Sequence, residues 1–314
     1  MNPGPFGRYA LLKRIAQGGL SELWLASPRG QQREGAHVLI KQVIPHVAED
    51  PEHLALFQQE VKISAHLQHP NIARFHEYGE AQGVHYIVRE YIHGEPLDEV
   101  MRQAQRTPSV LSQAMGLFIG ISVCEALHYA HTRVDNLGRP LKLVHREVLP
   151  RHILIGFDGW VKLIGFGGSL IATHQNEKRG GGILLAFDSM APEQASGDND
   201  LEELDLRTDV FCAGLVVYEL LTGVRPLRRE SNLESLFAAR ECRIPPPSRV
   251  GRSPVELDPL VMKALARERE DRYPSAREFQ LALEEGLRHV RGQADSKDLA
   301  ALMKKLFPQG SGAA

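Results

Sequence analysis

The sequence shows no cysteine pair at metal or redox spacing, no evident signal-peptide pattern and no long apolar run. Its three cysteines, Cys124, Cys212 and Cys242, lie far apart and form no metal or redox spacing. We interpret them as reduced thiols, which predicts a cytoplasmic protein. The N-terminus has no basic start followed by an apolar stretch. The most apolar segment, residues 111–128, is too short and too polar to cross a bilayer, so it predicts a core helix and no membrane insertion.

An excess of charge of one sign is also missing. The 37 basic and 39 acidic side chains give a formal net charge of −2. No basic surface for nucleic acid or for a membrane is therefore predicted. The length of 314 residues suffices for one large or two smaller domains with a buried core. The last residues, Gly310 to Ala314, are predicted to form a disordered tail.

The N-terminal part alternates β-branched, apolar segments with turn residues, which predicts short strands. One helix is expected after the acidic start at Asp50, Pro51 and Glu52, and the sequence His69-Pro70-Asn71 is expected to stop it. The predicted strands are residues 9–15, 22–26, 37–43, 72–76 and 84–88.

From residue 97 onward the apolar pattern follows a helical period. The predicted helices are residues 109–131, 210–222, 257–266, 275–290 and 296–307. The fold class is therefore α+β, with a small strand-rich lobe at residues 9–91 and a larger helical lobe at residues 92–290. An extension, residues 1–8, precedes them, and a C-terminal helix with its tail, residues 291–314, follows. This helix carries an apolar stripe, which either packs on the large lobe or docks a partner.

Two short segments carry the most informative pattern. Residues 143–154 read LVHREVLPRHIL and residues 161–167 read VKLIGFG. They resemble the catalytic loop H-R-D-x-K-P-x-N and the metal-binding turn D-F-G of protein kinases. The four departures are Glu147 for the base aspartate, Leu149 for the lysine, His152 for the asparagine and Gly165 for the metal-binding aspartate.

Further segments match the same family in the same order. Gly18 and Gly19 stand where the family has its glycine-rich loop, and Lys41 stands where a lysine contacts phosphates. Together the motifs resemble the bacterial eukaryotic-type (Hanks-type) Ser/Thr protein kinases over about residues 6–290, with a bilobal fold. The resemblance implies that Glu60 pairs with Lys41, and that the Glu90 carbonyl and the Ile92 amide would contact a purine.

Two substitutions change the implied nucleotide site. Leu39 replaces a small alanine beside the adenine, and overpacking of this kind typically costs about 1–3 kcal/mol. Arg89 stands at a position that is normally apolar. It either pairs with Glu60, in competition with Lys41, or extends outward with its stem buried.

The remaining motifs are structural. The sequence Met190-Ala191-Pro192-Glu193-Gln194 resembles the A-P-E that closes the activation segment. The resemblance implies a buried ion pair between Glu193 and Arg272, and a structural contact between His145 and a buried Asp209. The threonine that contacts the catalytic aspartate in the family corresponds to Ala186, within the altered segment 180–187.

The loss of both metal-binding side chains predicts failure of phosphoryl transfer, which depends on Mg²⁺. The sequence therefore predicts a pseudokinase that is not an enzyme, has no metal site and acts as a scaffold or allosteric regulator of a protein partner, such as an active kinase. No cofactor is expected, and ATP, if it binds, would bind without Mg²⁺. Two alternatives stay open. One is a weak or unconventional Ser/Thr kinase with substitute ligands such as His174 or Glu177, and the other is a nucleotide sensor.

Overall fold

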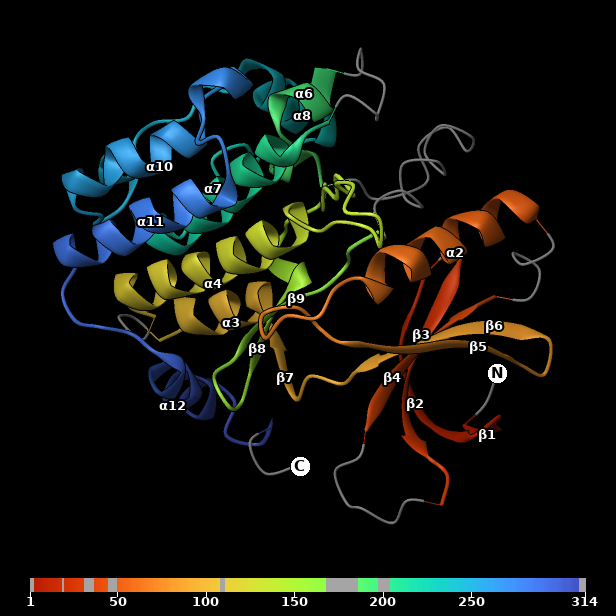
Figure 1. Cartoon of the computed structure of the whole chain (residues 1–314). Helices are drawn as coiled ribbons and strands as arrows, with labels where there is room; N and C mark the ends of the chain where they lie inside the picture. Colours follow the sequence, from red (N-terminus) through yellow and green to blue (C-terminus); the bar gives the residue numbers. More distant parts are fainter. Residues whose placement is uncertain are drawn as a thin grey trace. The chain divides into compact units, whose positions relative to one another are not determined.

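The computed structural model describes residues 3–18, 20–30, 37–44, 50–107, 111–167, 186–196 and 204–310. Two compact units make up these residues (Figure 1). The N-terminal unit runs to His93 and also takes in Phe166 and Gly167. The C-terminal unit runs from Gly94 to Gly165 and resumes at Ala186. The α+β fold class predicted from the sequence is confirmed, with a strand-rich and a helical part.

A six-stranded antiparallel sheet forms the N-terminal unit, in the order β1-β2-β3-β4-β6-β5. The strands are β1 (Gly4–Phe6), β2 (Tyr9–Gln17), β3 (Ser21–Pro28), β4 (Val38–Val43), β5 (Phe75–Ala81) and β6 (Val84–Glu90). The predicted strand at residues 72–76 is wrong at its start. The Ile72 amide donates to the carbonyl of His69 in a turn, so the strand begins at Phe75.

One helix, α2 (Pro51–Ala65), covers a face of this sheet. It starts where the sequence predicts, because the Asp50 side chain accepts a hydrogen bond from the Glu52 amide at 2.9 Å. Phe57 of this helix packs with Val43 and Ile87 of the sheet. A second apolar cluster on the sheet contains Phe6, Tyr9, Leu11, Trp24, Ala26, Ile40, Val84, Tyr86 and Val88. The helix is thereby fixed to the strands that carry the candidate ligand-binding residues.

The C-terminal unit is helical, with a small three-stranded sheet in the order β7-β8-β9. Its helices are α3 (Leu97–Gln105), α4 (Gln113–His131), α6 (Pro192–Ser196), α7 (Leu206–Thr222), α8 (Asn232–Glu241), α9 (Pro247–Val250), α10 (Asp258–Ala264), α11 (Ala276–Gly286) and α12 (Ser296–Leu306). Its strands are β7 (Gly94–Pro96), β8 (Ile153–Gly156) and β9 (Val161–Leu163). The long predicted helices are confirmed with shifted ends, whereas α3, α6, α8, α9, β7 and β8 were not predicted.

Helices α4 and α7 form the centre of this unit, and α11 packs against both. They approach closely at Gly120 of α4, where an added Cβ would lie 2.6 Å from a methyl group of Val217. Helix α7 begins at Leu206, four residues before the prediction, because the Asp205 side chain caps the Arg207 amide at 2.8 Å. This early start places Asp209 in the first turn of α7, where it reaches the loop described below.

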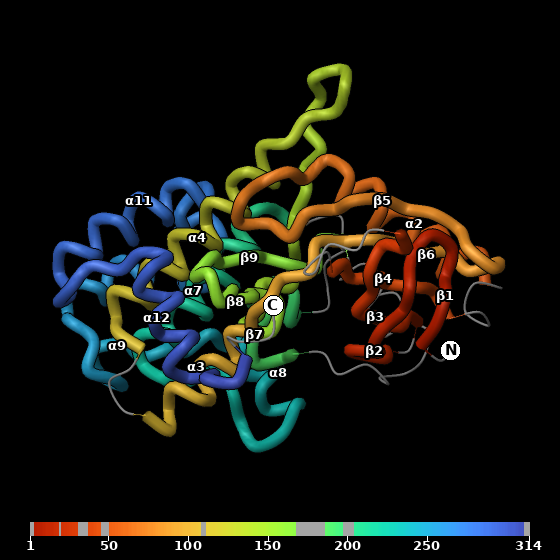
Figure 2. The backbone as a smooth tube through the Cα atoms, turned by 90° about the horizontal axis from the view of Figure 1, so that it is seen from below, coloured from red at the N-terminus to blue at the C-terminus, as the bar shows by residue number. Residues whose placement is uncertain are grey.

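The C-terminal helix α12 packs on the C-terminal unit, against α3 and β8 (Figure 2). Leu299, Leu302 and Met303 of its apolar stripe are buried. Of the two alternatives for this stripe, packing on the large lobe is therefore confirmed. Within the part of the chain that the structure describes, no helix combines the length and apolar character needed to cross a membrane.

Gly159 permits this packing, and we expect Gly159→Ala to disturb it. The residue has a φ of +83°, and an added Cβ would overlap the carbonyl oxygen of Ser296 at the start of α12. The control Gly138→Ala has a similar φ of +77° and nothing within 4 Å. Because overlap adds to the shared backbone strain, Gly159→Ala should lose about 1–3 kcal/mol more in denaturant-induced unfolding than Gly138→Ala. Equal losses in the two variants would contradict this packing.

Candidate functional site

Lys41, Glu60 and Arg89 meet inside the N-terminal unit. The Lys41 ammonium lies 2.6 Å from Oε2 of Glu60, as the sequence predicts. The Arg89 guanidinium lies 2.8 Å from Oε1 of Glu60 and 2.9 Å from the hydroxyl of Ser64. Arg89 therefore pairs with Glu60 and does not extend outward. The expected competition with Lys41 is wrong, because each cation takes its own carboxylate oxygen.

The carboxyl group of Glu60 stays ionised in this arrangement. Burial raises the pKa of Glu60, but the charges of Lys41 and Arg89 and their hydrogen bonds more than offset it, so the pKa lies below its ordinary value. The Glu60 side chain is 4% exposed, against 22% for Lys41 and 14% for Arg89. Lys41 is therefore the member of the cluster that a ligand can reach most readily.

The glycine-rich turn joins β2 to β3. The Gly18 amide donates to the carbonyl of Ser21 at 2.9 Å, and Gln17 pairs with Glu22 across the two strands. Gly19 lies outside the described residues. Glu22 was not singled out from the sequence, yet its buried carboxylate accepts hydrogen bonds from the Trp24 indole, the Gln42 amide and Arg14. These bonds hold the base of the turn.

The predicted purine contacts lie at the end of β6. The Glu90 amide donates to the Arg74 carbonyl at 2.8 Å, and the Glu90 carboxylate accepts the Arg74 amide at 2.9 Å. Ile92 follows outside the sheet and is partly buried. The roles of the Glu90 carbonyl and the Ile92 amide toward a purine stay predictions.

Asp209 fixes the catalytic loop in the C-terminal unit. Its carboxylate accepts the backbone amides of His145 and Arg146, both at 2.7 Å, and lies 2.8 Å from Nε2 of His131. Arg146 has a φ of +68°, a strained conformation that these bonds stabilise. The predicted contact between His145 and Asp209 is confirmed, although it goes through the backbone. His131 was missed, because nothing in its sequence context distinguishes it from other helix residues.

The two histidines of the loop donate hydrogen bonds through different ring nitrogens. His152 has Nδ1 at 2.9 Å from the Glu147 carbonyl, so this nitrogen donates. His145 has Nε2 at 2.9 Å from the Ile164 carbonyl, so it donates there, and its Nδ1 accepts the Glu147 amide. Burial lowers the pKa of both imidazoles. The Glu147 carboxylate is partly exposed and pairs with Arg151 at 2.9 Å.

The other degenerate positions offer little to a cation. Leu149 is 4% exposed and belongs to the core of the C-terminal unit. Gly165 has a φ of +97°, and an added Cβ would make ordinary contacts of 3.6 Å with His145 and His152. Space for a side chain therefore exists at Gly165, but the left-handed backbone disfavours one.

These residues do not fit a magnesium ion held as the family motif implies. Gly165 supplies no ligand, and His152 offers one imidazole nitrogen, whereas Mg²⁺ prefers oxygen. Among the described residues no three His, Cys, Asp or Glu side chains gather as a metal site. The suggested substitute ligands His174 and Glu177, and residues 180–185, lie outside the described residues.

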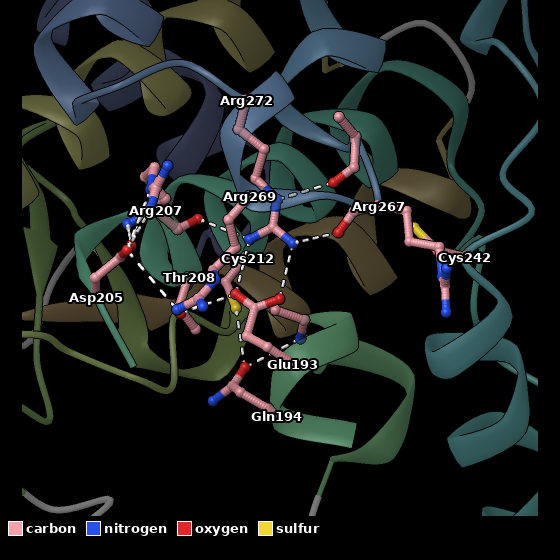
Figure 3. Close-up of polar contacts among 12 residues, drawn as sticks. Glu193, Gln194, Asp205, Arg207, Thr208, Cys212, Cys242, Arg267, Arg269 and Arg272 are labelled. Atoms are coloured by element: carbon pink, nitrogen blue, oxygen red, sulfur yellow. Dashed lines mark hydrogen bonds and ion pairs between the residues drawn. The ribbon is translucent and has the colours of Figure 1, made fainter. Parts of the chain in front are cut away.

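The predicted ion pair between Glu193 and Arg272 is confirmed (Figure 3). Nη1 and Nη2 of Arg272 each lie 2.7 Å from one oxygen of Glu193, and the Thr208 hydroxyl donates to the same carboxylate at 2.9 Å. Burial raises the pKa of Glu193, but Arg272 holds it below its ordinary value. The remaining Arg272 hydrogen bonds go to the carbonyls of Arg207, Ala266 and Arg267. The arginine side chain is fully buried, so this pair anchors α6 to the helical core.

Comparisons with known proteins agree with the fold. The family model described as protein tyrosine and serine/threonine kinase matches residues 9–283. The tyrosine-protein kinase MasK of Myxococcus xanthus is 35% identical over 304 residues, which is 96% of this chain and 46% of that protein. The serine/threonine-protein kinase PknB of Mycobacterium leprae is 32% identical over 88% of this chain and 42% of its own length. The chain thus spans less than half the length of these relatives.

A solved structure is similar over nearly the whole domain. The PknI kinase domain of Mycobacterium tuberculosis has 26% sequence identity and a TM-score of 0.65, with coverage of 91% of this chain and 99% of that one. The prediction that the chain is not an enzyme is contradicted by these findings, because the matched relatives are named as tyrosine or serine/threonine kinases and nothing in the described residues demonstrates inactivity. The chain belongs to the protein tyrosine and serine/threonine kinase family.

Proposed function

We propose that this chain is an unconventional protein kinase, which transfers the γ-phosphoryl group of ATP slowly to a serine, threonine or tyrosine hydroxyl of a protein. The observation that supports it most is the ion pair between Lys41 and Glu60 at 2.6 Å. This pair presents an ammonium group for the α- and β-phosphates, which is its role in the family. Gly18, Gly19, Glu90 and Ile92 are the further proposed nucleotide-binding residues.

Glu147 is the proposed general base. In the proposed reaction the acceptor oxygen attacks the γ-phosphorus, the bond to the β-phosphate oxygen breaks, ADP leaves, and the hydroxyl proton passes to the Glu147 carboxylate. The longer side chain displaces the carboxylate relative to an aspartate, and a misplacement of about 1 Å can cost on the order of 100-fold in rate. Arg151 holds this carboxylate at 2.9 Å, which restricts its freedom. A slow enzyme is the expected result.

The family normally uses ATP together with Mg²⁺, which conflicts with the expectation that ATP binds without the ion. The described residues do not supply the usual metal ligands, so we assign no step to a bound metal here. What these residues provide for the nucleotide is the cation Lys41.

We expect the purified protein to incorporate labelled phosphate from [γ-³²P]ATP into itself or into casein, with Mg²⁺ or Mn²⁺ supplied. Glu147→Gln should lower the rate by about 100- to 10,000-fold, the range for loss of a general base. Lys41→Met should also abolish transfer, and it should fold because Arg89 still pairs with Glu60. The exposed Glu256→Gln is the matched control and should leave the rate unchanged.

Phosphoamino-acid analysis of the product would identify the accepting hydroxyl. Incorporation that persists in both Lys41→Met and Glu147→Gln would indicate a contaminating kinase. A saturable ATP-dependent melting shift without any transfer would contradict the proposal and support a nucleotide sensor. An ATP concentration of 100 times the dissociation constant should raise the free energy of unfolding by about 2.7 kcal/mol.

The partner in this proposal is the protein that carries the acceptor hydroxyl. A scaffolding role beside an active kinase stays a prediction, because no contact in the described residues identifies such a partner. The domain boundaries given from the sequence and the cytoplasmic localisation also stay predictions.

A further inference from the structure

The Glu60 carboxylate receives two cations inside the N-terminal unit. Lys41 contacts Oε2 at 2.6 Å and Arg89 contacts Oε1 at 2.8 Å. One buried negative charge therefore lies between two positive charges. Because a second cation contacts the same carboxylate, the negative charge of Glu60 is not balanced by Lys41 alone.

Arg89 also reaches further along helix α2 than Lys41 does. Its Nη2 donates to Oε1 of Glu60 and, at 2.9 Å, to the hydroxyl of Ser64, one helical turn later. Both side chains are almost fully buried, with Glu60 3% and Ser64 4% exposed. Arg89 comes from β6, which pairs with both β4 and β5. One guanidinium group thus joins two turns of the helix to an internal strand of the sheet.

Among the described residues of α2, the buried side chains are Phe57, Glu60 and Ser64, of which two are polar. The buried cluster beside the helix contains Phe57, Val43 and Ile87, with partly buried residues around it. Gly167 lies against the same turn, where an added Cβ would come 3.0 Å from Cα of Glu60. The polar bonds of Arg89 therefore hold a substantial part of this helix in place.

We infer that Arg89 is a positioning residue that fastens α2 to β6, so that Glu60 holds Lys41 in place for the phosphates of a nucleotide. The fastening itself is independent of any ligand. The consequence for Lys41 rests on the function proposed above.

The physical reason lies in the cost of an unpaired buried charge. Removing one partner of a buried ion pair leaves the other uncompensated and is strongly destabilising. In Arg89→Met the Glu60 carboxylate would keep Lys41 as its cation but would lose its bond to β6. The Lys41 ammonium, which lies 2.6 Å from Glu60, would then be held less firmly. Arg89 thereby keeps Lys41 in place for a polyanionic ligand.

Hydrogen exchange of the α2 amides in the nucleotide-free protein tests the fastening. In Arg89→Met the amides of residues 57–65 should exchange about 10- to 100-fold faster, as expected for the loss of hydrogen bonds to a charged group. Lys41→Met should change these exchange rates by less than about threefold, because Arg89 keeps its hydrogen bonds to Glu60 and Ser64. Arg89→Lys should restore protection in part, since an ammonium group can still reach the carboxylate.

Arg8→Met is the matched control, because Nε of Arg8 donates to Oε1 of Glu77 in the same sheet at 3.1 Å, outside the glycine-rich turn and the Glu60 cluster. Its α2 amides should exchange as in the parent. Unchanged exchange in Arg89→Met, or equal acceleration in Lys41→Met, would overturn the inference. If Arg89→Met does not fold, Arg89→Lys and Ser64→Ala decide, since each must accelerate exchange more than Lys41→Met does.

ATP affinity separates this inference from the proposed function. Arg89→Met should weaken ATP binding about tenfold in a melting titration, whereas Arg8→Met should not, and Arg89→Lys should recover part of the loss. An unchanged ATP affinity in Arg89→Met would overturn the consequence drawn for Lys41. Failure of phosphate transfer in the parent would refute the proposed kinase activity, yet the exchange rates of α2 would still decide whether Arg89 fastens the helix.

Discussion

Arg272→Met is expected to lower the free energy of unfolding by about 3–5 kcal/mol, because it leaves the buried Glu193 carboxylate without its cation. The substitution also removes the hydrogen bonds of Arg272 to three backbone carbonyls. A loss of this size is a large fraction of a typical domain's stability. Denaturant-induced unfolding followed by circular dichroism measures it.

The control for this prediction is Arg288→Met. Arg288 pairs with Glu285 within one helical turn, and its side chain is 75% exposed, so the loss should be about 0–1 kcal/mol. The double variant Glu193→Gln with Arg272→Met should be less destabilised than the sum of the single variants, since it leaves no unpaired charge. A melting temperature of Arg272→Met close to that of the parent would show that the pair does not anchor α6.

Asp209→Ala should destabilise the protein about as much as Arg272→Met, and it should also abolish catalysis. The change removes the acceptor of the His145 and Arg146 amides and the partner of His131. Each unpaired buried donor costs about 1–3 kcal/mol, so the total should reach about 3–5 kcal/mol. Phosphate transfer should fall below detection, because the loop that carries Glu147 loses its support. Thermal unfolding and the labelled-ATP assay measure the two effects.

Asp205→Ala provides the comparison from the same helix. Asp205 caps the start of α7 but is 37% exposed, and the loss of such a cap typically costs about 1 kcal/mol. The hydrogen bonds of the Asp205 side chain go to Arg207 and not to the catalytic loop, so transfer should continue in this variant. Equal destabilisation by the two substitutions would show that Asp209 acts only as a helix residue.

The sequence predicted the candidate site best where one motif implies the partner of another. Lys41 with Glu60 and Glu193 with Arg272 were inferred as pairs, and both pairs are present in the structure. The side chains of each pair carry opposite charges and stand at fixed motif positions, so few alternative partners compete. His131 could not be found in this way, because a histidine near a helix end has many possible partners.

The four substituted positions show a limit of motif reading. Glu147, Leu149, His152 and Gly165 differ from the family motif, but the conclusion of inactivity drawn from them is contradicted by the kinase relatives. A motif records which side chains differ. It does not record what rate the remaining groups support, which depends on distances and on the whole charge distribution.

The family, the long helices and the charged pairs could be read from the sequence, because these follow from local periodicity and from residues at fixed motif positions. The direction of the Arg89 side chain and the partner of the α12 stripe are known only from the folded structure. Arg89 had two open alternatives until the hydroxyl of Ser64 and the carboxylate of Glu60 were placed beside it. Leu299, Leu302 and Met303 could equally have faced a partner. An apolar stripe or a buried cation must find a complement, but its own sequence does not state which distant segment supplies it.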